Sequence, residues 1–225
     1  MNCASRLLPA RHPELRDANS TYKNNDKRWN SSADLEPNAP KTALSSVRMA
    51  TVTTDKTAIS ALVIMGVSGC GKSEVGQCIA DHAHGRLIEG DSFHPAANIE
   101  KMSAGIALND EDRAGWLTRL GEELANAVAK GERPVLTCSA LKRQYRERLR
   151  EAVPELGFVF LELSAQMARQ RCAQRPNHFM PASLVDSQFA ALEPPIGEPR
   201  TLVVDASQSI QALGQQAADW WQASR

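Results

Sequence analysis

From residue 58 onward, short apolar runs alternate with stretches that have the 3.6-residue period of amphipathic helices. The apolar runs predict strands over residues 59–65, 86–89, 134–139, 158–163 and 201–205. Helices are predicted over residues 74–82, 110–129, 141–151, 164–173, a stretch ending before 194, and 210–222. Strands that alternate with helices form parallel sheets covered on both faces. We therefore predict an α/β fold with a five-stranded parallel sheet, whose ligands bind beyond the carboxyl ends of the strands.

Residues 1 to about 57 show no sustained period of 3.6 or 2 and are rich in Asn, Ser, Thr, Pro and charged side chains. This composition predicts a disordered leader, and residues 58–225 are predicted to form one domain. Met49 stands shortly before the first predicted strand, so one hypothesis is that the native protein begins there. Mass spectrometry of the native protein tests it, because an intact peptide covering residues 1–48 would contradict it.

Directly after the first predicted strand, eight residues fit the phosphate-loop pattern G-x-x-x-x-G-K-[ST]. Glycines let backbone N–H groups converge on phosphate oxygens, and the helix that follows adds the positive end of its dipole. Lys72 is predicted to reach the β- and γ-phosphates of a nucleoside triphosphate, and Ser73 to hold Mg²⁺. The alternative is an ordinary glycine-rich turn. The predicted nucleotide-binding residues are Gly66, Val67, Ser68, Gly69, Cys70, Gly71, Lys72 and Ser73.

Composition excludes several classes of partner. In the 225 residues, 26 basic and 26 acidic side chains cancel, so no net charge draws the chain to nucleic acid or to a membrane surface. No apolar run approaches the 18 residues of a membrane span. The five cysteines form no C-x-x-C pair and no zinc-ligand spacing, which favours a reduced intracellular protein.

Asp91 and His94 follow the second predicted strand, so their side chains are expected to face the phosphate loop. A carboxylate at this place can orient or deprotonate a hydroxyl that attacks the γ-phosphorus. The alternative is that Asp91 caps the helix starting near Pro95. For His94, a site role and a purely structural role are about equally supported.

Two further segments combine capping residues with cations. Asn109 or Asp110 suits the N-cap of the following helix, and Arg113 lies one turn in, where it could bind a carboxylate or phosphate. Lys142 and Arg146 are four residues apart and share a helix face after the third strand. Paired cations at the carboxyl end of a strand suit an anionic substrate, the alternative being a solvated basic face.

Arginines also surround a polar break after residue 173. Kinases of small molecules need a segment that closes over the nucleotide and excludes water, and arginines around it can neutralise the transferring phosphoryl group. The alternative is an ordinary loop between helices. Within this predicted lid we assign catalytic roles to Arg171 and Arg175.

Taken together, these segments resemble the gluconate kinase family, that is, gluconokinases of the thermoresistant type, within the phosphate-loop kinases. The resemblance covers residues 59 to 222 approximately, and Cys70 departs from a frequent serine in the family's loop. The matching segments are M-G-V-S-G-C-G-K-S at 65–73, G-D-S-F-H-P at 90–95, N-I-E-K-M at 98–102, L-N-D-E-D-R at 108–113, C-S-A-L-K at 138–142, H-F-M-P at 178–181, S-Q-F at 187–189 and L-E-P at 192–194.

The resemblance implies a three-layer phosphate-loop kinase fold with a short lid, and ATP-dependent phosphorylation of D-gluconate to 6-phosphogluconate by a cytoplasmic homodimer. It implies ATP and Mg²⁺ at the phosphate loop, with Asp91 and Lys72 as catalytic groups. Rival hypotheses are a kinase of another small anion, such as shikimate or a nucleoside monophosphate, and an ATP-binding regulatory protein. The implied gluconate-binding residues are Asp91, His94, Arg113, Lys142 and Arg146.

Overall fold

A sheet of five parallel strands forms the centre of the fold, as the apolar runs predict. The protein is described by a computed structural model over residues 58–174 and 183–224, so the predicted leader, Arg175 and most of the predicted lid lie outside the described residues. The order across the sheet is β2-β3-β1-β4-β5. The strands are β1 (Ala61–Met65), β2 (Arg86–Glu89), β3 (Pro134–Thr137), β4 (Leu156–Glu162) and β5 (Thr201–Asp205).

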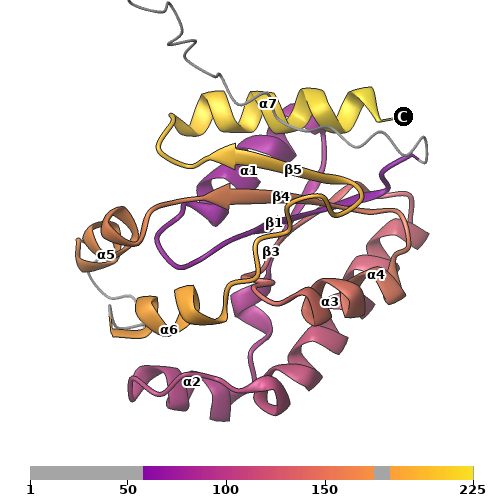
Figure 1. Ribbon diagram of the computed structural model, residues 1–225. Coiled ribbons are helices and arrows are strands. Elements are labelled where there is room, and N and C mark those ends of the chain that lie inside the picture. The colour runs from indigo at the N-terminus through magenta and orange to yellow at the C-terminus, as the bar shows by residue number, and fades with distance from the viewer. Residues whose placement is uncertain (1–57, 175–182, 225) are drawn as a thin grey trace, which may run out of the picture. The chain divides into compact units, whose positions relative to one another are not determined.

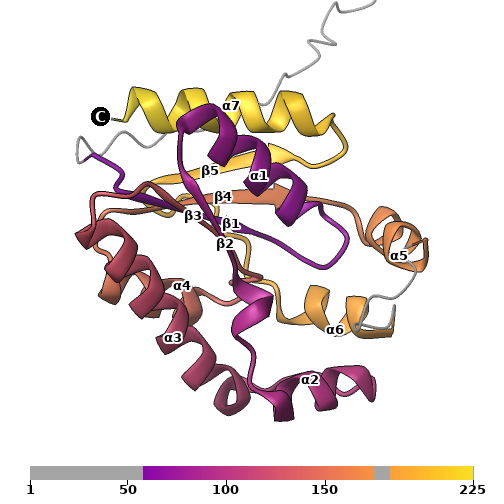
Figure 2. The ribbon, with the colours of Figure 1, turned by 180° about the vertical axis from the view of Figure 1, so that it is seen from behind.

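Helices cover both faces of this sheet, which makes three layers (Figure 1). The helices α1 (Lys72–Ala83) and α7 (Ile210–Ala223) lie on one face, and α3 (Asp110–Ala129) and α4 (Arg143–Ala152) lie on the other, as Figure 2 shows from behind. Side chains of β1 alternate between the two cores: Leu62 and Ile64 pack toward α1 and α7, and Val63 and Met65 toward α3 and α4. Burying each such side chain contributes roughly 1.5–3 kcal/mol, so both layers are held to the central strand.

Shorter helices gather at the carboxyl end of the strands, on the side to which the arrowheads in Figure 1 point. After β2 come a 3₁₀ helix, η1 (Gly90–Phe93), and α2 (Ala96–Ser103). After β4 come α5 (Ala165–Ala173) and α6 (Ser183–Ala191), which flank the undescribed residues 175–182. Within the described ranges, no helix combines the length and apolar composition that a membrane crossing requires.

Most predicted elements are confirmed to within two residues at each end, and the differences have local causes. The predicted third strand stops at Thr137, and the helix after it starts at Arg143 rather than 141. Between them Ala140 adopts a left-handed conformation with φ 42°, which neither a strand nor a helix accommodates. The Glu193 carboxylate accepts the Arg143 backbone N–H at 2.6 Å, and this contact sets the helix start.

Candidate functional site

The phosphate loop connects β1 to α1 at the centre of the sheet, and its backbone makes the turns that its glycines permit. Gly69 has φ 82° and Gly71, the N-cap of α1, has φ 91°. A Cβ at Gly69 would come within 2.9 Å of the Ala168 carbonyl oxygen, so α5 also leaves no room for a side chain there. The backbone N–H groups of the loop and of the first turn of α1 can therefore approach phosphate oxygens closely.

Lys72 and Ser73 start α1 and stand where the pattern predicts them. The Lys72 ammonium donates to the carbonyl oxygens of Gly66 at 3.2 Å and Val67 at 3.1 Å, so the cation folds over the loop. The Ser73 hydroxyl donates to Glu89 Oε2 at 3.2 Å, and the Thr137 hydroxyl donates to the same oxygen at 2.6 Å. These contacts bring a hydroxyl and a carboxylate, both hard oxygen donors that suit Mg²⁺, to one side of the loop.

Glu89 is a residue that the sequence reasoning missed. It ends β2, one residue before Gly90 and two before Asp91. Two acidic residues separated by one glycine at the end of a strand could have indicated it, since both then leave the sheet at the same edge. The described residues contain no cluster of three or more His, Cys, Asp or Glu side chains that could hold a metal.

Asp91 and His94 are positioned by a close backbone approach at Gly90. A Cβ at Gly90 would lie 2.1 Å from the Thr137 carbonyl oxygen, so only glycine lets η1 pack against the end of β3. Trp116 of α3 donates from its indole N–H to the Gly90 carbonyl oxygen at 2.8 Å. The interpretation of Asp91 as a helix cap is wrong, because the N-cap of α2 is Pro95, without a side-chain cap. The Asp91 side chain is exposed.

The charges of Asp91, Arg113 and Lys72 all act on the thiol of Cys138, which directly follows β3. Burial raises the pKa of the Cys138 thiol to about 12, Asp91 adds to the rise, and Arg113 and Lys72 oppose it. The sheet order explains this convergence, because β3 lies between β2, which leads to Asp91, and β1, which leads to Lys72. The predicted base and the phosphate-loop lysine thus lie on either side of one strand end.

His94 is buried and stacks on Trp116, with ring centroids 4.1 Å apart. Burial lowers the pKa of His94 to about 4, and the nearby Arg113 also lowers it, against an opposing effect of Asp91. The imidazole is therefore neutral at pH 7 and close to Asn98, whose amide lies 3.4 Å from Nδ1. A neutral ring can exchange hydrogen bonds with hydroxyls but adds no charge to an anion site.

This burial predicts a pH dependence of stability. The folded-state pKa of about 4 lies below the 6.5 of histidine in an unfolded chain, so the His94 contribution to stability is fully present above pH 6.5 and is lost as the pH falls toward 4. Between pH 7 and 5 we expect His94 to lower the free energy of unfolding by about 2 kcal/mol. Denaturant titrations should show a shallower pH dependence for His94→Gln, whereas the exposed-site control His84→Asn should keep the wild-type slope. An unchanged slope in His94→Gln would contradict this prediction.

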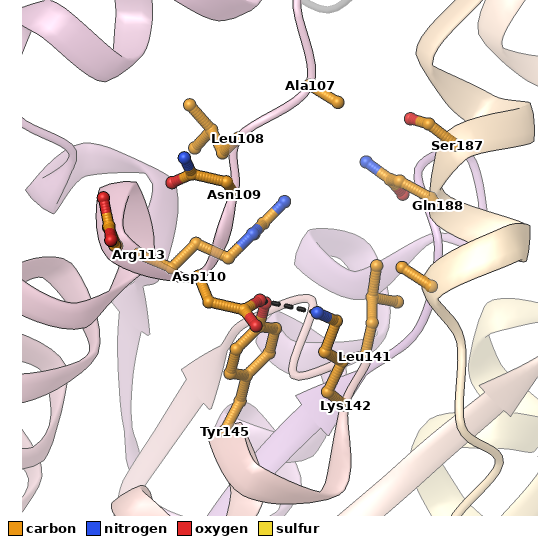
Figure 3. Close-up of a pocket in the computed structure, with 12 residues that line it drawn as sticks. Ala107, Leu108, Asn109, Asp110, Arg113, Leu141, Lys142, Tyr145, Ser187 and Gln188 are labelled. Atoms are coloured by element: carbon orange, nitrogen blue, oxygen red, sulfur yellow. Dashed lines mark hydrogen bonds and ion pairs between the residues drawn. The ribbon is translucent and has the colours of Figure 1, made fainter.

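A polar cavity of about 470 Å³ lies between the start of α3, the start of α4 and one side of α6. Figure 3 shows Asp110 and Lys142 facing each other from α3 and the start of α4, with Ser187 and Gln188 on the opposite wall. The lining residues are Ala107, Leu108, Asn109, Asp110, Glu111, Arg113, Leu141, Lys142, Tyr145, Ser187, Gln188 and Ala191.

The two cations of this cavity differ in their partners. Lys142 lies 2.6 Å from Asp110, which also accepts from the Tyr145 hydroxyl; these contacts, Lys142 first, lower the pKa of Asp110 to about 2. Arg113 contacts the Ser139 hydroxyl at 3.5 Å and lies over the Tyr145 ring. Among the described residues it forms no ion pair with a carboxylate, so its charge is the one that a bound anion can use.

The N-cap of α3 is Asn109, paired with Asp112 in a capping box, which confirms the capping interpretation.

Gln188 joins the cavity to the phosphate loop. It accepts the Ser68 backbone N–H at 2.7 Å and donates to the Ser68 hydroxyl at 3.2 Å, and it also lines the cavity. Gln188 belongs to the S-Q-F segment at 187–189, but nothing in the sequence indicates this contact. On the other side of the loop, Arg171 donates to the carbonyl oxygens of Gly69 at 3.5 Å and Ala206 at 3.0 Å.

The structure corrects the predicted place of Arg146. Its spacing from Lys142 predicts that both side chains lie in the substrate site, but the Arg146 side chain is 1% exposed and does not line the cavity. Lys142 is the N-cap of α4 rather than part of the helix, so the four-residue spacing does not align the two side chains. The Arg146 guanidinium points to Glu198 instead.

Comparison with known proteins shows which family the chain belongs to. A protein-family model described as "AAA domain" matches residues 62–195. The thermosensitive gluconokinase of Escherichia coli K12 is 41% identical over 155 residues, which cover 68% of this chain and 83% of that protein. The chain belongs to the gluconokinase family.

Further gluconokinases extend this match. That of Gluconobacter oxydans is 48% identical over 134 residues, covering 60% of this chain and 75% of that protein. The crystal structure of a gluconokinase from Sinorhizobium meliloti is 45% identical with a TM-score of 0.67, covering 74% of this chain and 94% of that one. The predicted resemblance and the three-layer phosphate-loop fold are thereby confirmed. At 19% identity and a TM-score of 0.57, a Mycobacterium tuberculosis APS kinase shares the fold alone.

Proposed function

We propose that this gluconokinase-family chain transfers the γ-phosphoryl group of ATP to the 6-hydroxyl of D-gluconate. The observation that carries the proposal is Arg113, a cation without a carboxylate partner among the described residues, in a polar cavity that Gln188 joins to the phosphate loop. A sugar acid brings both a carboxylate for this cation and hydroxyls for the polar walls. The names of the relatives support the same acceptor.

On the donor side, the loop amides and the first turn of α1 would bind the ATP phosphates. Lys72 would turn from the carbonyl oxygens of Gly66 and Val67 to the β- and γ-phosphates. The Ser73 hydroxyl would hold Mg²⁺, with Glu89 beside it. When bound, the cation neutralises phosphate charge as the γ-phosphoryl group departs. Arg171, which lies against the loop, is proposed to stabilise that same charge.

On the acceptor side, the Asp91 carboxylate would take the proton of the 6-hydroxyl. The bond from O6 to the γ-phosphorus forms, the bond from the γ-phosphorus to the β–γ bridging oxygen breaks, and ADP leaves with that oxygen. The neutral His94 ring and Lys142 are proposed to hold hydroxyls of the sugar chain, and Arg113 its carboxylate. The homodimer stays a prediction from the resemblance, and the catalytic role of Arg175 in the lid stays a prediction from the arginines around the polar break.

An acceptor screen tests this proposal. In an ADP-coupled assay we expect turnover with gluconate and roughly a hundredfold lower kcat/KM with sorbitol, which has a neutral CH₂OH in place of the carboxylate. Arg113→Met should lower kcat/KM for gluconate strongly and for sorbitol little. Arg119→Met, on the same helix but exposed and paired with Glu122 and Glu123, is the matched control.

The screen also decides between the rival functions. Turnover with shikimate or a nucleoside monophosphate but none with gluconate would replace the proposed acceptor. ATP binding without turnover on any acceptor would favour the regulatory protein. Equal loss on gluconate and sorbitol in Arg113→Met would contradict the carboxylate role while leaving the reaction itself intact.

A further inference from the structure

A buried arginine holds the segment that carries one wall of the acceptor cavity. Arg146 extends from α4, and its Nη1 donates to the carbonyl oxygens of Ala140 at 3.0 Å and Leu141 at 3.1 Å. Its other side donates through Nε and Nη2 to Glu198, with Nη2 and Oε1 2.5 Å apart. Arg146 therefore ties residues 138–142, which we call the acceptor loop, to the loop that precedes β5.

The acceptor loop needs such a tie because its conformation is strained. Ala140 has φ 42°, in the left-handed region that a residue with a Cβ occupies at a cost. Strained backbone of this kind persists when surrounding contacts hold it. Two other hydrogen bonds also hold the acceptor loop. The Gly66 N–H donates to the Ser139 carbonyl oxygen at 3.3 Å, and the Glu193 N–H donates to the Leu141 carbonyl oxygen at 2.9 Å.

The loop reaches both halves of the site. Ser139 contacts Arg113 and the start of the phosphate loop, and Lys142 points into the cavity toward Asp110. A change in the direction of the Ala140 and Leu141 peptides would therefore move Lys142 relative to Arg113. Arg146 itself does not line the cavity: among the described residues its hydrogen bonds reach it only through the backbone of Leu141, and none goes to the phosphate loop.

Glu198 also binds a second arginine, which offers a comparison within the same network. Arg150 lies one turn after Arg146 on α4 and contacts Glu198 Oε2 at 3.0 Å. Its other contacts with described residues are the Pro199 carbonyl oxygen and the Phe158 ring, and neither belongs to the acceptor loop. Burial would raise the pKa of the Glu198 carboxyl, but the bonds from both arginines outweigh it and hold the pKa below its usual value.

We propose that Arg146, fixed by Glu198, is a positioning residue that sets the acceptor loop and thereby the affinity for the anionic acceptor. This inference rests on the proposed function for the identity of the acceptor, but the contacts of the loop do not depend on it. A buried ion pair by itself is weak evidence for stability, since desolvation offsets its attraction. Here the same guanidinium also donates hydrogen bonds to two backbone carbonyl oxygens, which an apolar side chain could not do.

Steady-state kinetics of Arg146→Lys and Arg150→Lys test the proposal. Lysine keeps the charge beside Glu198 but has one nitrogen, which cannot serve Glu198 and both carbonyls in the same geometry. We expect Arg146→Lys to raise the KM for gluconate about tenfold or more and to leave the KM for ATP within about twofold. Arg150→Lys should leave both KM values near the wild type. Unchanged gluconate KM in Arg146→Lys, or an equal rise in both variants, would overturn the proposal.

Hydrogen exchange followed by mass spectrometry supplies a readout without any acceptor. The amides of Arg143 and Glu193 bond at or beside the acceptor loop, so both should exchange about tenfold faster in Arg146→Lys than in Arg150→Lys. Equal exchange in the two variants overturns the positioning role. If wild-type protein shows no gluconate turnover but the exchange difference is present, the proposed function fails and the positioning role stands.

Glu198→Gln covers the case in which Arg146→Lys does not fold. It keeps an oxygen acceptor for Arg146 but removes the charge that fixes both arginines. A folded Glu198→Gln protein, judged by thermal melting, should show faster exchange at Arg143 and a higher gluconate KM than wild type. Wild-type values for both would overturn the proposal.

Discussion

Lys72→Met is expected to lower kcat/KM for ATP-dependent turnover by roughly a thousandfold or more. Methionine has a similar length, so α1 can keep its first turn, but the variant loses the cation that the loop carbonyls hold over the phosphate site. The negative charge that develops on the transferring group then has no ammonium beside it. Because the lysine also contacts ground-state phosphates, we expect both weaker ATP binding and slower turnover.

The measurement for Lys72 combines coupled-assay kinetics with calorimetric titration of ATP. Lys130→Met is the control, because Lys130 is an exposed residue at the far end of α3. It should bind ATP and turn over as the wild type does. Turnover of Lys72→Met within tenfold of the wild type would show that the loop lysine is not the main phosphate cation.

Asp91→Asn is expected to reduce kcat on the order of a thousandfold while ATP binding stays close to the wild-type value. The substitution is nearly isosteric, and no hydrogen bond of the Asp91 carboxylate to a described side chain would be broken, so the fold should be kept. What is lost is the ability to accept the hydroxyl proton. Since Asp91 lies across β3 from Lys72 rather than in the phosphate loop, the effect should fall on turnover and not on nucleotide affinity.

Asp81→Asn on α1 provides the matched control for Asp91. Asp81 is exposed near the carboxyl end of α1, and within the described ranges its side chain is hydrogen-bonded to Gln77 alone. Single-turnover experiments with saturating ATP separate the chemical step from product release. Near-wild-type single-turnover rates in Asp91→Asn would refute the base role and leave Glu89, the other carboxylate at the end of β2, as the candidate.

The fold was predictable because its signals are local. Buried parallel strands are continuous apolar runs, and β1 shows this directly, with Leu62 and Val63 facing opposite cores and both fully buried. The phosphate loop was predictable for a similar reason, since glycine positions, lysine and serine follow one another along eight residues. Asp91 followed from its place after a strand, and Asn109 from capping chemistry.

Arg146 shows where such reasoning fails. The spacing from Lys142 is right for one helix face, but the helix begins only after Lys142, because the strained Ala140 and the Glu193 cap delay it. Glu193 and Glu198 are 50 and 52 residues beyond their partners Arg143 and Arg146, and no pattern in the sequence links them. Gln188 was missed for the same reason, since its partner Ser68 lies 120 residues away. Glu89 is different: its place beside Gly90 and Asp91 was a sequence signal, but its contact with Ser73, 16 residues away, was not.

By itself the sequence determined the parallel α/β fold, the phosphate loop, the family and the carboxylate beyond β2. All of these depend on residues close together in the chain, where periodicity and fixed spacing carry the information. Only the tertiary structure decided which cation is available to an anion, Arg113 rather than Arg146, and which residues hold the acceptor loop. Those outcomes depend on burial and on partners brought together by the sheet order β2-β3-β1-β4-β5, and burial of a charge is decided by what packs around it.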